Sequence, residues 1–142
     1  FMNTILVLHI FFCSFMTGVI WLVQILIYPN FKNVGNAEFE KFHDFHMNRI
    51  TWVVGPVMVL ELATGTWLLV KFQSSFFLWN FISILLLWFL TALVNVPTHK
   101  NLTYQNLLSK TNLVSKNWPR TIIWTFRLIL WLYWLVEKVE KT

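Results

Sequence analysis

The hydrophobic positions of this chain fall into four long runs that polar segments separate. Three runs, residues 4–28, 50–70 and 76–96, each reach roughly the 20 residues that a helix needs to cross the hydrocarbon core of a bilayer. A fourth and shorter run covers residues 119–138. Because each polar segment must return the chain to the next run, neighbouring helices should be antiparallel. The pattern predicts one all-α domain over residues 1–142, an integral membrane antiparallel four-helix bundle.

Composition agrees with a membrane protein. Hydrophobic residues make up 57% of the 142 positions and charged residues only 12%, whereas a soluble domain carries about twice that charged fraction. The one cysteine, Cys13, lies within the first run, so the sequence predicts neither a disulfide nor a cysteine-based metal motif. The basic residues form no run and no binding motif, so no nucleic acid partner is expected.

Lysine and arginine are distributed unevenly between the two sides of such a bundle. The segments 29–49 and 97–120 hold seven of these residues, and the opposite side holds three. By the positive-inside rule, both segments face the cytoplasm and both termini lie outside. Amphipathic helical segments are expected on the cytoplasmic side, at 37–48 and within 97–120. We expect the location to be a bacterial inner membrane.

Polar and aromatic side chains recur at helical spacing within the runs, so each set shares one face of its helix. In lipid such a face is favoured inside the bundle, where amides and hydroxyls meet other helices. The candidate cofactor-binding residues at the cytoplasmic ends of these faces are Gln24, Tyr28, His46, Asn95, His99, Asn117 and Arg120. The alternative is that these side chains satisfy one another and hold the bundle together.

Glu61 is the only ionisable residue in the run 50–70. Placing a carboxylate at that depth costs a few kcal/mol on insertion scales, so it requires a partner. The candidate partner is Arg127, which lies about 10 Å deeper than Arg120 at 1.5 Å of helical rise per residue. The sequence therefore predicts a buried ion pair between Glu61 and Arg127.

Histidines supply the candidate metal and haem chemistry. His43 and His46 are three residues apart, a spacing that lets two imidazoles on one helical face reach one metal ion. With His99 they would supply three ligands to zinc, although no carboxylate base is evident at that depth. Haem needs one or two imidazoles facing an apolar slot, and His46 and His99 meet that need best. Interfacial histidines are also commonly solvated or capping residues.

Several motifs carry a resemblance to known families. In the first half they are Leu8-His9-Ile10, residues 21–28, Arg49, Pro56-Val57-Met58, Gly65 and Trp67-Leu68-Leu69. On these residues the first half resembles the HemJ-type protoporphyrinogen oxidases, small four-helix membrane proteins that bind haem b. The resemblance implies that His9 binds the haem; the lysine that the family has in its third helix has no counterpart in 76–96.

The second half carries a different resemblance. Its motifs are Val96-Pro97-x-His99 and Asn117-Trp118-x-Arg120-Thr121-x-x-Trp124-x-x-Arg127. On these residues it is similar to small bacterial four-helix membrane proteins whose function is not established. This resemblance implies the fold and no activity.

Two functions follow from the sequence. The first is a cytoplasm-facing polar and aromatic pocket that binds a cofactor or a small amphipathic ligand, with a haem b oxidoreductase of the HemJ type as its most specific form. The second is a non-catalytic membrane subunit or assembly factor whose buried polar residues are structural. The partners expected are the lipid bilayer, the small-molecule or haem ligand, and a membrane protein or a second copy of the chain.

Overall fold

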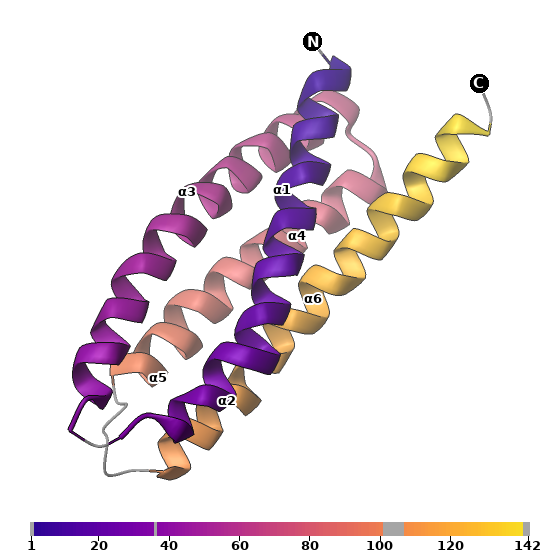
Figure 1. The fold of residues 1–142 in the computed structure, drawn as a ribbon. Helices are drawn as coiled ribbons and strands as arrows, with labels where there is room; N and C mark the ends of the chain where they lie inside the picture. Colours follow the sequence, from indigo (N-terminus) through magenta and orange to yellow (C-terminus); the bar gives the residue numbers. More distant parts are fainter. Residues whose placement is uncertain (1, 36, 101–106, 141–142) are drawn as a thin grey trace.

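The computed structural model describes residues 2–35, 37–100 and 107–140, and within these ranges the chain is helical with no strand. The helical elements form four long rods. These rods lie side by side, and successive rods run in opposite directions (Figure 1). The beginning of the first rod and the end of the fourth lie at the same end of the molecule, which we call the terminal end. The opposite end, which carries α2 (Tyr28–Asn30) and α5 (Val96–Lys100), is called the loop end (Figure 1).

The first rod changes helix type near the loop end. It consists of α1 (Met2–Leu22), the π-helix η1 (Val23–Ile27), α2 and the 3₁₀-helix η2 (Phe31–Asn33). The predicted end of this helix at Tyr28 is wrong, because helical backbone continues through Pro29. A proline lacks the N–H of the α-helical ladder and its ring collides with the carbonyl four residues back. The π turn just before Pro29 is wider than an α-helical turn, so the proline ring can be accommodated without that collision.

The third rod repeats this arrangement. It consists of α4 (Ser75–Leu90), the π-helix η3 (Thr91–Asn95) and α5. Pro97 lies two residues after the end of η3, just as Pro29 lies two residues after the end of η1. Both π turns therefore lie near the loop end, where they widen the first and third rods next to the candidate polar residues.

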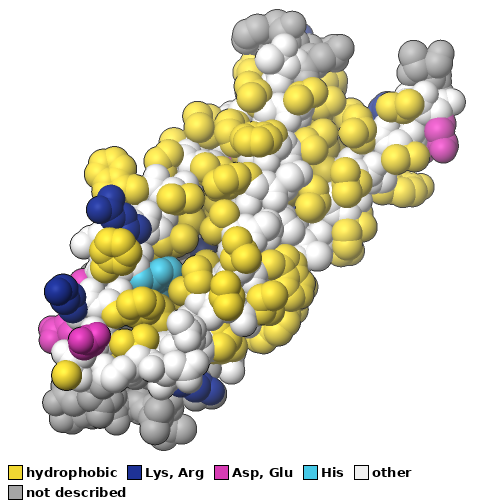
Figure 2. Space-filling model, in the orientation of Figure 1, with side chains coloured by type: hydrophobic (Ala, Val, Ile, Leu, Met, Phe, Trp, Pro, Cys, Tyr) yellow, Lys and Arg dark blue, Asp and Glu magenta, His cyan; other side chains and the backbone are white. Residues whose placement is uncertain are grey.

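The second rod is the single helix α3 (Phe39–Phe72), which is 34 residues long. At 1.5 Å per residue it measures about 51 Å, longer than the ~30 Å hydrocarbon core of a bilayer. Its first turns therefore project beyond the apolar segment 50–70. Figure 2 shows charged side chains gathered at the loop end, where α3 begins, and apolar side chains over most of the rest of that face.

The fourth rod is α6 (Leu107–Val139), with Pro119 inside it. The prediction that this helix begins near Pro119 is wrong, because the preceding residues are also helical. Leu113 is fully buried, and the backbone carbonyl of Val114 accepts a hydrogen bond from Gln24. Contacts with the first rod thus stabilise the extension of α6 toward the loop end, and this extension supplies the helical segment expected within 97–120.

Three helical segments of the described chain are long and apolar enough to cross a membrane by length and composition: Thr4–Asn33, Phe39–Phe72 and Ser75–His99. The fourth predicted run, in α6, is not among them. Its two arginines, Arg120 and Arg127, and its several tryptophans lower its hydropathy.

The α3 helix packs very closely against its neighbours at Gly65. A Cβ atom at this position would lie 2.5 Å from Cδ1 of Ile84 and 3.2 Å from Cε1 of His9. Ile84 and His9 are themselves almost completely buried. Gly65 therefore sets how closely α3 approaches both α1 and α4.

We predict that Gly65→Ala lowers the thermal stability of the protein in lipid nanodiscs. The added methyl must displace buried atoms, which costs about 1–3 kcal/mol in a packed core. Gly55→Ala on the same helix is the matched control, because a Cβ there meets nothing within 4 Å. Thermal unfolding of both variants is the measurement. Equal midpoints for the two variants would show that Gly65 is not a close contact.

Candidate functional site

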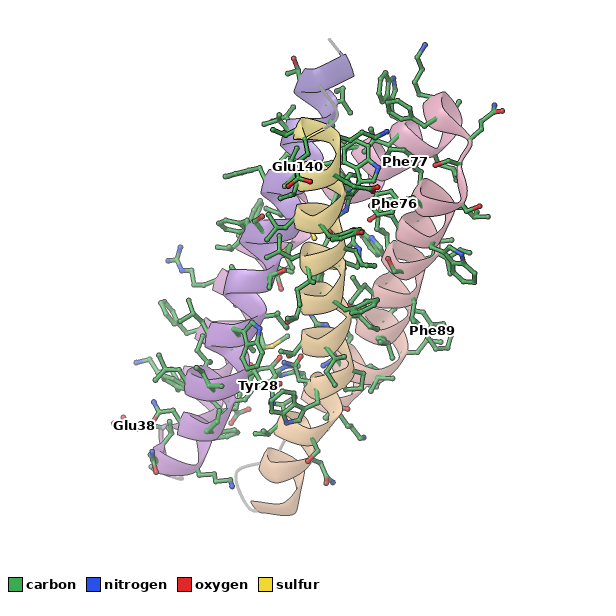
Figure 3. All side chains as sticks on the ribbon, turned by 90° about the vertical axis from the view of Figure 1, so that its right-hand side faces the viewer. Tyr28, Glu38, Phe76, Phe77, Phe89 and Glu140 are labelled. Carbon is green, nitrogen blue, oxygen red and sulfur yellow. The ribbon has the colours of Figure 1, made fainter. Side chains whose placement is uncertain are left out.

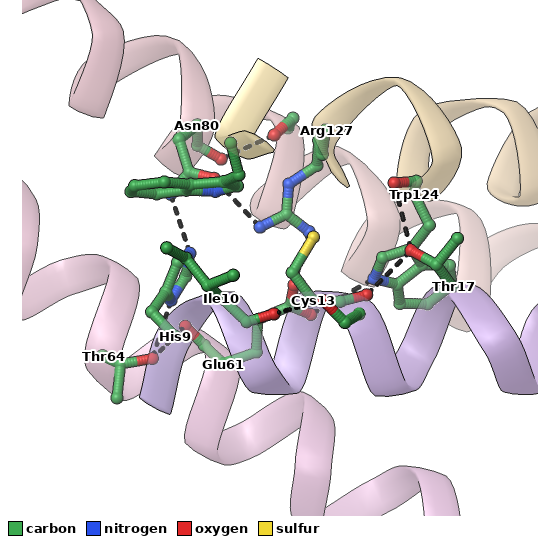
Figure 4. Close-up of polar contacts among 12 residues, drawn as sticks. His9, Ile10, Cys13, Thr17, Glu61, Thr64, Asn80, Trp124 and Arg127 are labelled. Carbon is green, nitrogen blue, oxygen red and sulfur yellow. Dashed lines mark hydrogen bonds and ion pairs between the residues drawn. The ribbon is translucent and has the colours of Figure 1, made fainter. Parts of the chain in front are cut away.

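An ion pair lies inside the bundle between α3 and α6. Nη1 of Arg127 donates a hydrogen bond to Oε1 of Glu61 at 2.6 Å, and the two side chains are 3% and 2% exposed. The other carboxylate oxygen, Oε2, accepts a hydrogen bond from Nε1 of Trp124 at 3.3 Å (Figure 4). Both oxygens of the buried carboxylate therefore have a donor, and the pair expected from the sequence is present in the structure.

Asn80 of α4 connects this ion pair to the first rod. Its Oδ1 accepts hydrogen bonds from Nη2 of Arg127 and from Nε1 of Trp131, both at 3.0 Å. Its Nδ2 lies 3.1 Å from Nε2 of His9, whose Nδ1 lies 2.8 Å from Oγ1 of Thr64 (Figure 4). Because an amide nitrogen can only donate, Nε2 of His9 accepts and the ring proton is on Nδ1.

We call this group of side chains the central network. It draws members from α1, α3, α4 and α6, so it joins all four rods. Its members are His9, Glu61, Thr64, Asn80, Trp124, Arg127 and Trp131.

His9 does not have the surroundings that a haem ligand needs. The resemblance to HemJ-type proteins implies a ring nitrogen that is free to bind iron. In the structure the side chain is fully buried, and Asn80 and Thr64 occupy its two ring nitrogens. His9 therefore lies in the central network and not with the candidate residues near the loop end, and its assignment to the cofactor-binding set stays a prediction.

Near the loop end, a tyrosine and two histidines form a chain of hydrogen bonds. Oη of Tyr28 lies 2.9 Å from Nε2 of His99, and Nδ1 of His99 lies 3.0 Å from Nε2 of His43. The rings of His43 and His99 stack with centroids 5.3 Å apart. His46 lies beside them, with its ring 6.3 Å from that of Tyr28.

The predicted metal set of His43, His46 and His99 is not assembled as a metal site. Among the residues that the structure describes, no group of three or more His, Cys, Asp or Glu side chains could hold a metal ion. His43 and His99 instead share a hydrogen bond with each other, and the second ring nitrogen of His99 is bonded to Tyr28.

Three amide side chains of the predicted set lie close to this chain of hydrogen bonds. Nδ2 of Asn117 donates to Oε1 of Gln24 at 2.8 Å, and Nε2 of Gln24 donates to the carbonyl of Val114. In the amide orientation that satisfies both of its polar atoms, Asn95 accepts from Nη1 of Arg120 at 3.3 Å. Gln24 and Asn117 therefore mainly bond within the bundle, as the structural alternative predicts.

A cavity of about 220 Å³ lies beside these residues, and we call it the loop-end cavity. Of the predicted cofactor-binding residues, Tyr28, Asn95, His99 and Arg120 line it, while Gln24, His46 and Asn117 do not. Its apolar lining comes mainly from Met16, Val19, Ile20, Val23, Met47, Ile50, Val54, Met58 and Val96. The cavity therefore combines an apolar wall with a polar one.

Two buried donors on the lining of this cavity have no hydrogen-bond partner: Nε1 of Trp88 and Nε of Arg120. Arg120 is 7% exposed, and the described residues place no carboxylate within ion-pair distance of it. Its guanidinium lies over the ring of Trp124 at 5.4 Å, a contact that only partly offsets its charge. The polar wall of the cavity therefore carries the charge of Arg120 and two buried donors without acceptors.

The two histidines that precede the apolar segment 50–70 have shifted pKa values. Burial lowers the pKa of His43, and the nearby carboxylate of Asp44 opposes that shift. Burial also lowers the pKa of His46, and the charge of His43 lowers it further. Both imidazoles are therefore held neutral at a pH where a solvated histidine would begin to take up a proton.

Sequence reasoning missed two residues that the geometry makes prominent. Asn80 lies three residues before Ser83, so extending the polar face of the third run by one turn would have included it. Trp88 carried no signal, because an unpaired indole N–H cannot be distinguished in the sequence from those of the other tryptophans.

Comparisons with family models, with curated proteins and with solved structures give no match, so the functional argument depends on the site itself.

We predict that Glu61→Gln and Arg127→Gln each destabilise the bundle, by about 3–5 kcal/mol, because each leaves a buried charge without its partner. The loss in the free energy of unfolding of the double variant should be smaller than the sum of the losses of the two single variants, because the double variant has no unpaired buried charge. Unfolding in nanodiscs of the wild type and the three variants completes this cycle. Strictly additive losses would contradict a direct interaction between the two side chains.

We also predict that acidification destabilises the loop end. The folded-state pKa values of His43 and His46 lie below the ordinary value of 6.5. As the pH falls, these histidines therefore take up protons in the unfolded chain at a higher pH than in the folded chain. The stability they contribute is complete above about pH 6.5 and is lost as the pH falls toward the folded-state values. The thermal midpoint of the protein should therefore fall as the pH is lowered from about 7.5 to about 5.

The matched control is the double variant His43→Gln, His46→Gln, which cannot titrate at these positions. Its thermal midpoint should change less with pH than that of the wild type. A wild-type midpoint that rises on acidification would contradict the direction of both pKa shifts.

Proposed function

We propose that the chain is an integral membrane protein whose loop-end cavity binds a small amphipathic ligand with an anionic head. The first part of this proposal rests on the three apolar helical segments together with α6, which would cross the bilayer with them. The uneven distribution of lysine and arginine favours a cytoplasmic loop end with both termini outside, and the membrane proposed is a bacterial inner membrane.

The inclusion of α6 among the membrane-crossing helices rests on how its two faces differ. Trp124, Arg127 and Trp131 are almost completely buried against the other rods. Ile122 and Phe126, on the outer face, are both 60% exposed. A helix with its arginine paired inside and large apolar side chains outside suits a bilayer, where polar groups are favoured only within the bundle.

The observation that carries the ligand proposal is the pair of unpartnered donors, Trp88 Nε1 and Arg120 Nε. A buried donor without an acceptor costs about 1–3 kcal/mol, and more when it is charged. A carboxylate or phosphate bound in the cavity would neutralise Arg120, and its oxygens are the kind of acceptor that these donors lack. The opposite wall, with Met16, Ile20 and Met58, suits a short apolar body.

Haem b does not fit this cavity. Haem requires an imidazole nitrogen that faces an apolar slot, but both ring nitrogens of His99 are hydrogen-bonded and His46 does not line the cavity. The volume of about 220 Å³ also lies below the roughly 300–1,000 Å³ of sites for drug-sized ligands. The expectation of a haem-dependent oxidoreductase therefore has no support in this geometry.

A second candidate function is a non-catalytic membrane subunit or assembly factor. The central network favours it, because hydrogen bonds within the bundle satisfy nearly all of its polar atoms and give it a structural role. In that case the exposed apolar faces would contact a membrane protein or a second copy of the chain. Ligand binding at the loop-end cavity distinguishes the two functions.

Decanoate is a suitable probe, because it joins a carboxylate to an apolar chain. We predict that it raises the thermal midpoint of the protein in nanodiscs and that Arg120→Gln weakens its binding about tenfold or more, as expected for a lost charged hydrogen bond. Lys116→Gln, which removes an exposed cation one turn away on α6, should leave the affinity unchanged. Decanol, which lacks the carboxylate, should not stabilise the protein.

Equal decanoate affinity in the wild type and in Arg120→Gln would overturn the proposal in favour of the structural subunit. An absorbance spectrum of the same preparation tests the haem alternative directly. We expect no Soret band. A Soret band that disappears in His46→Ala or His99→Ala would restore a haem site at the loop end, and one that disappears only in His9→Ala would restore the HemJ-like site.

A further inference from the structure

A second and larger cavity, of about 470 Å³, lies between α4 and α6, and we call it the α4–α6 groove. It shares no lining residue with the loop-end cavity. Its lining consists of Phe76, Trp79, Asn80, Ser83, Leu86, Ile122, Ile123, Phe126, Arg127, Leu130 and Trp131. Figure 3 shows Phe76 near the terminal end of the molecule and Tyr28 near the loop end, so the two cavities occupy different levels of the bundle.

The groove opens onto the apolar outer surface of the bundle. Four of its lining side chains are at least 44% exposed: Trp79, Leu86, Ile122 and Phe126. A bilayer around the helices would place acyl chains against these residues. The molecules with access to the groove are therefore those dissolved in the membrane.

The inner wall of the groove is polar, because members of the central network reach it. Arg127 is 3% exposed, and its Nη1 and Nη2 atoms donate to Glu61 and Asn80. The third guanidinium nitrogen, Nε, is buried and has no partner. Arg127, which lines the groove, thus keeps an unused Nε donor beneath a largely apolar lining.

The charge of the inner wall decides what kind of acceptor fits. Glu61 already neutralises Arg127 at 2.6 Å, so an anionic ligand would gain little from the arginine and would be repelled by the carboxylate. A neutral carbonyl oxygen can accept from Nε without adding a charge. This distinguishes the groove from the loop-end cavity, where Arg120 has no carboxylate partner.

The depth of the groove in the membrane and the shape of its lining limit further which ligands can bind there. Arg127 lies about 10 Å along the helix from Arg120, well below the level at which lipid headgroups and ester carbonyls meet water. Aromatic side chains line the groove at Phe76, Trp79, Phe126 and Trp131. Such side chains favour flat conjugated rings, which stack on them or meet their edges.

From these features we infer that the α4–α6 groove binds a membrane-dissolved quinone, a neutral flat ring whose carbonyl oxygen accepts a hydrogen bond from Arg127. This inference goes beyond the ligand proposed for the loop-end cavity, since the cavity, the charge of the ligand and the route of access all differ. Neither site requires the other.

The test uses a decyl-substituted benzoquinone added to the full chain in phosphatidylcholine nanodiscs. Leu86→Trp fills the groove, and Leu85→Trp on the neighbouring residue is the matched control. The two leucines are 44% and 47% exposed, but only Leu86 lines the groove. The quinone should raise the thermal midpoints of the wild type and of Leu85→Trp and leave that of Leu86→Trp unchanged.

Arg127→Lys tests the hydrogen bond, because lysine keeps a positive charge for Glu61 and removes the Nε donor. We expect the dissociation constant for the quinone to rise about tenfold. If Arg127→Lys does not fold, comparison of Leu86→Trp with Leu85→Trp still shows whether the quinone binds in the groove. A competition experiment with decanoate is the second part of the test. Because decanoate is an anion, it should not displace the quinone from the groove.

Three results would overturn the inference. The first is a quinone that stabilises Leu86→Trp as much as Leu85→Trp. The second is a quinone that stabilises no form of the protein, which would show that the groove does not bind this quinone. The third is displacement of the quinone by decanoate, which would show that the groove prefers an anion.

Discussion

The structure depends on the buried ion pair between Glu61 and Arg127. Removing two charges from water is costly, and their attraction offsets that cost only if the geometry is good and the remaining polar atoms have partners. Here Trp124 bonds the second carboxylate oxygen, and Asn80 bonds the second guanidinium nitrogen. Asn80 in turn bonds His9 of α1. The need to satisfy one carboxylate therefore fixes the relative positions of all four rods.

The two cavities follow from the same requirement. Arg127 is directed inward by Glu61 and is one of the residues that line the α4–α6 groove, and its buried Nε has no hydrogen-bond partner. Arg120 lies two turns away on α6 and has no carboxylate within ion-pair distance among the described residues, so it gives the loop-end cavity a positive wall. One arginine is neutralised and the other is not, and for that reason the ligands proposed for the two cavities differ in charge.

Much of this arrangement could be predicted from the sequence. Glu61 and Arg127 stand out because a lone charge in an apolar run needs a partner, and helical spacing identified the faces that carry Tyr28, Asn95 and His99. The ends of the helices could not be predicted in the same way. By local rules Pro29 indicates the end of one helix and Pro119 the beginning of another, but a π turn near Pro29 and packing around Leu113 keep the chain helical at both.

The histidines show the limit of sequence reasoning most clearly. Spacing places His43 and His46 on one face, but it does not reveal that His43 bonds His99 of another rod. Likewise, nothing near His9 in the sequence indicates Asn80 and Thr64, which occupy its ring nitrogens. Whether an imidazole is free to bind a metal depends on contacts between residues far apart in the chain, and these contacts become visible only in the fold.

The charge state of Glu61 tests the central claim most directly. Infrared spectra of the wild type and of Glu61→Gln in lipid nanodiscs at neutral pH can be subtracted, because Glu61 is the only carboxylic acid in the apolar run 50–70. The ion pair predicts that the difference spectrum contains the bands of an ionised carboxylate and lacks a protonated carbonyl band. A protonated carbonyl band that belongs to Glu61 would contradict the ion pair and the arrangement built on it.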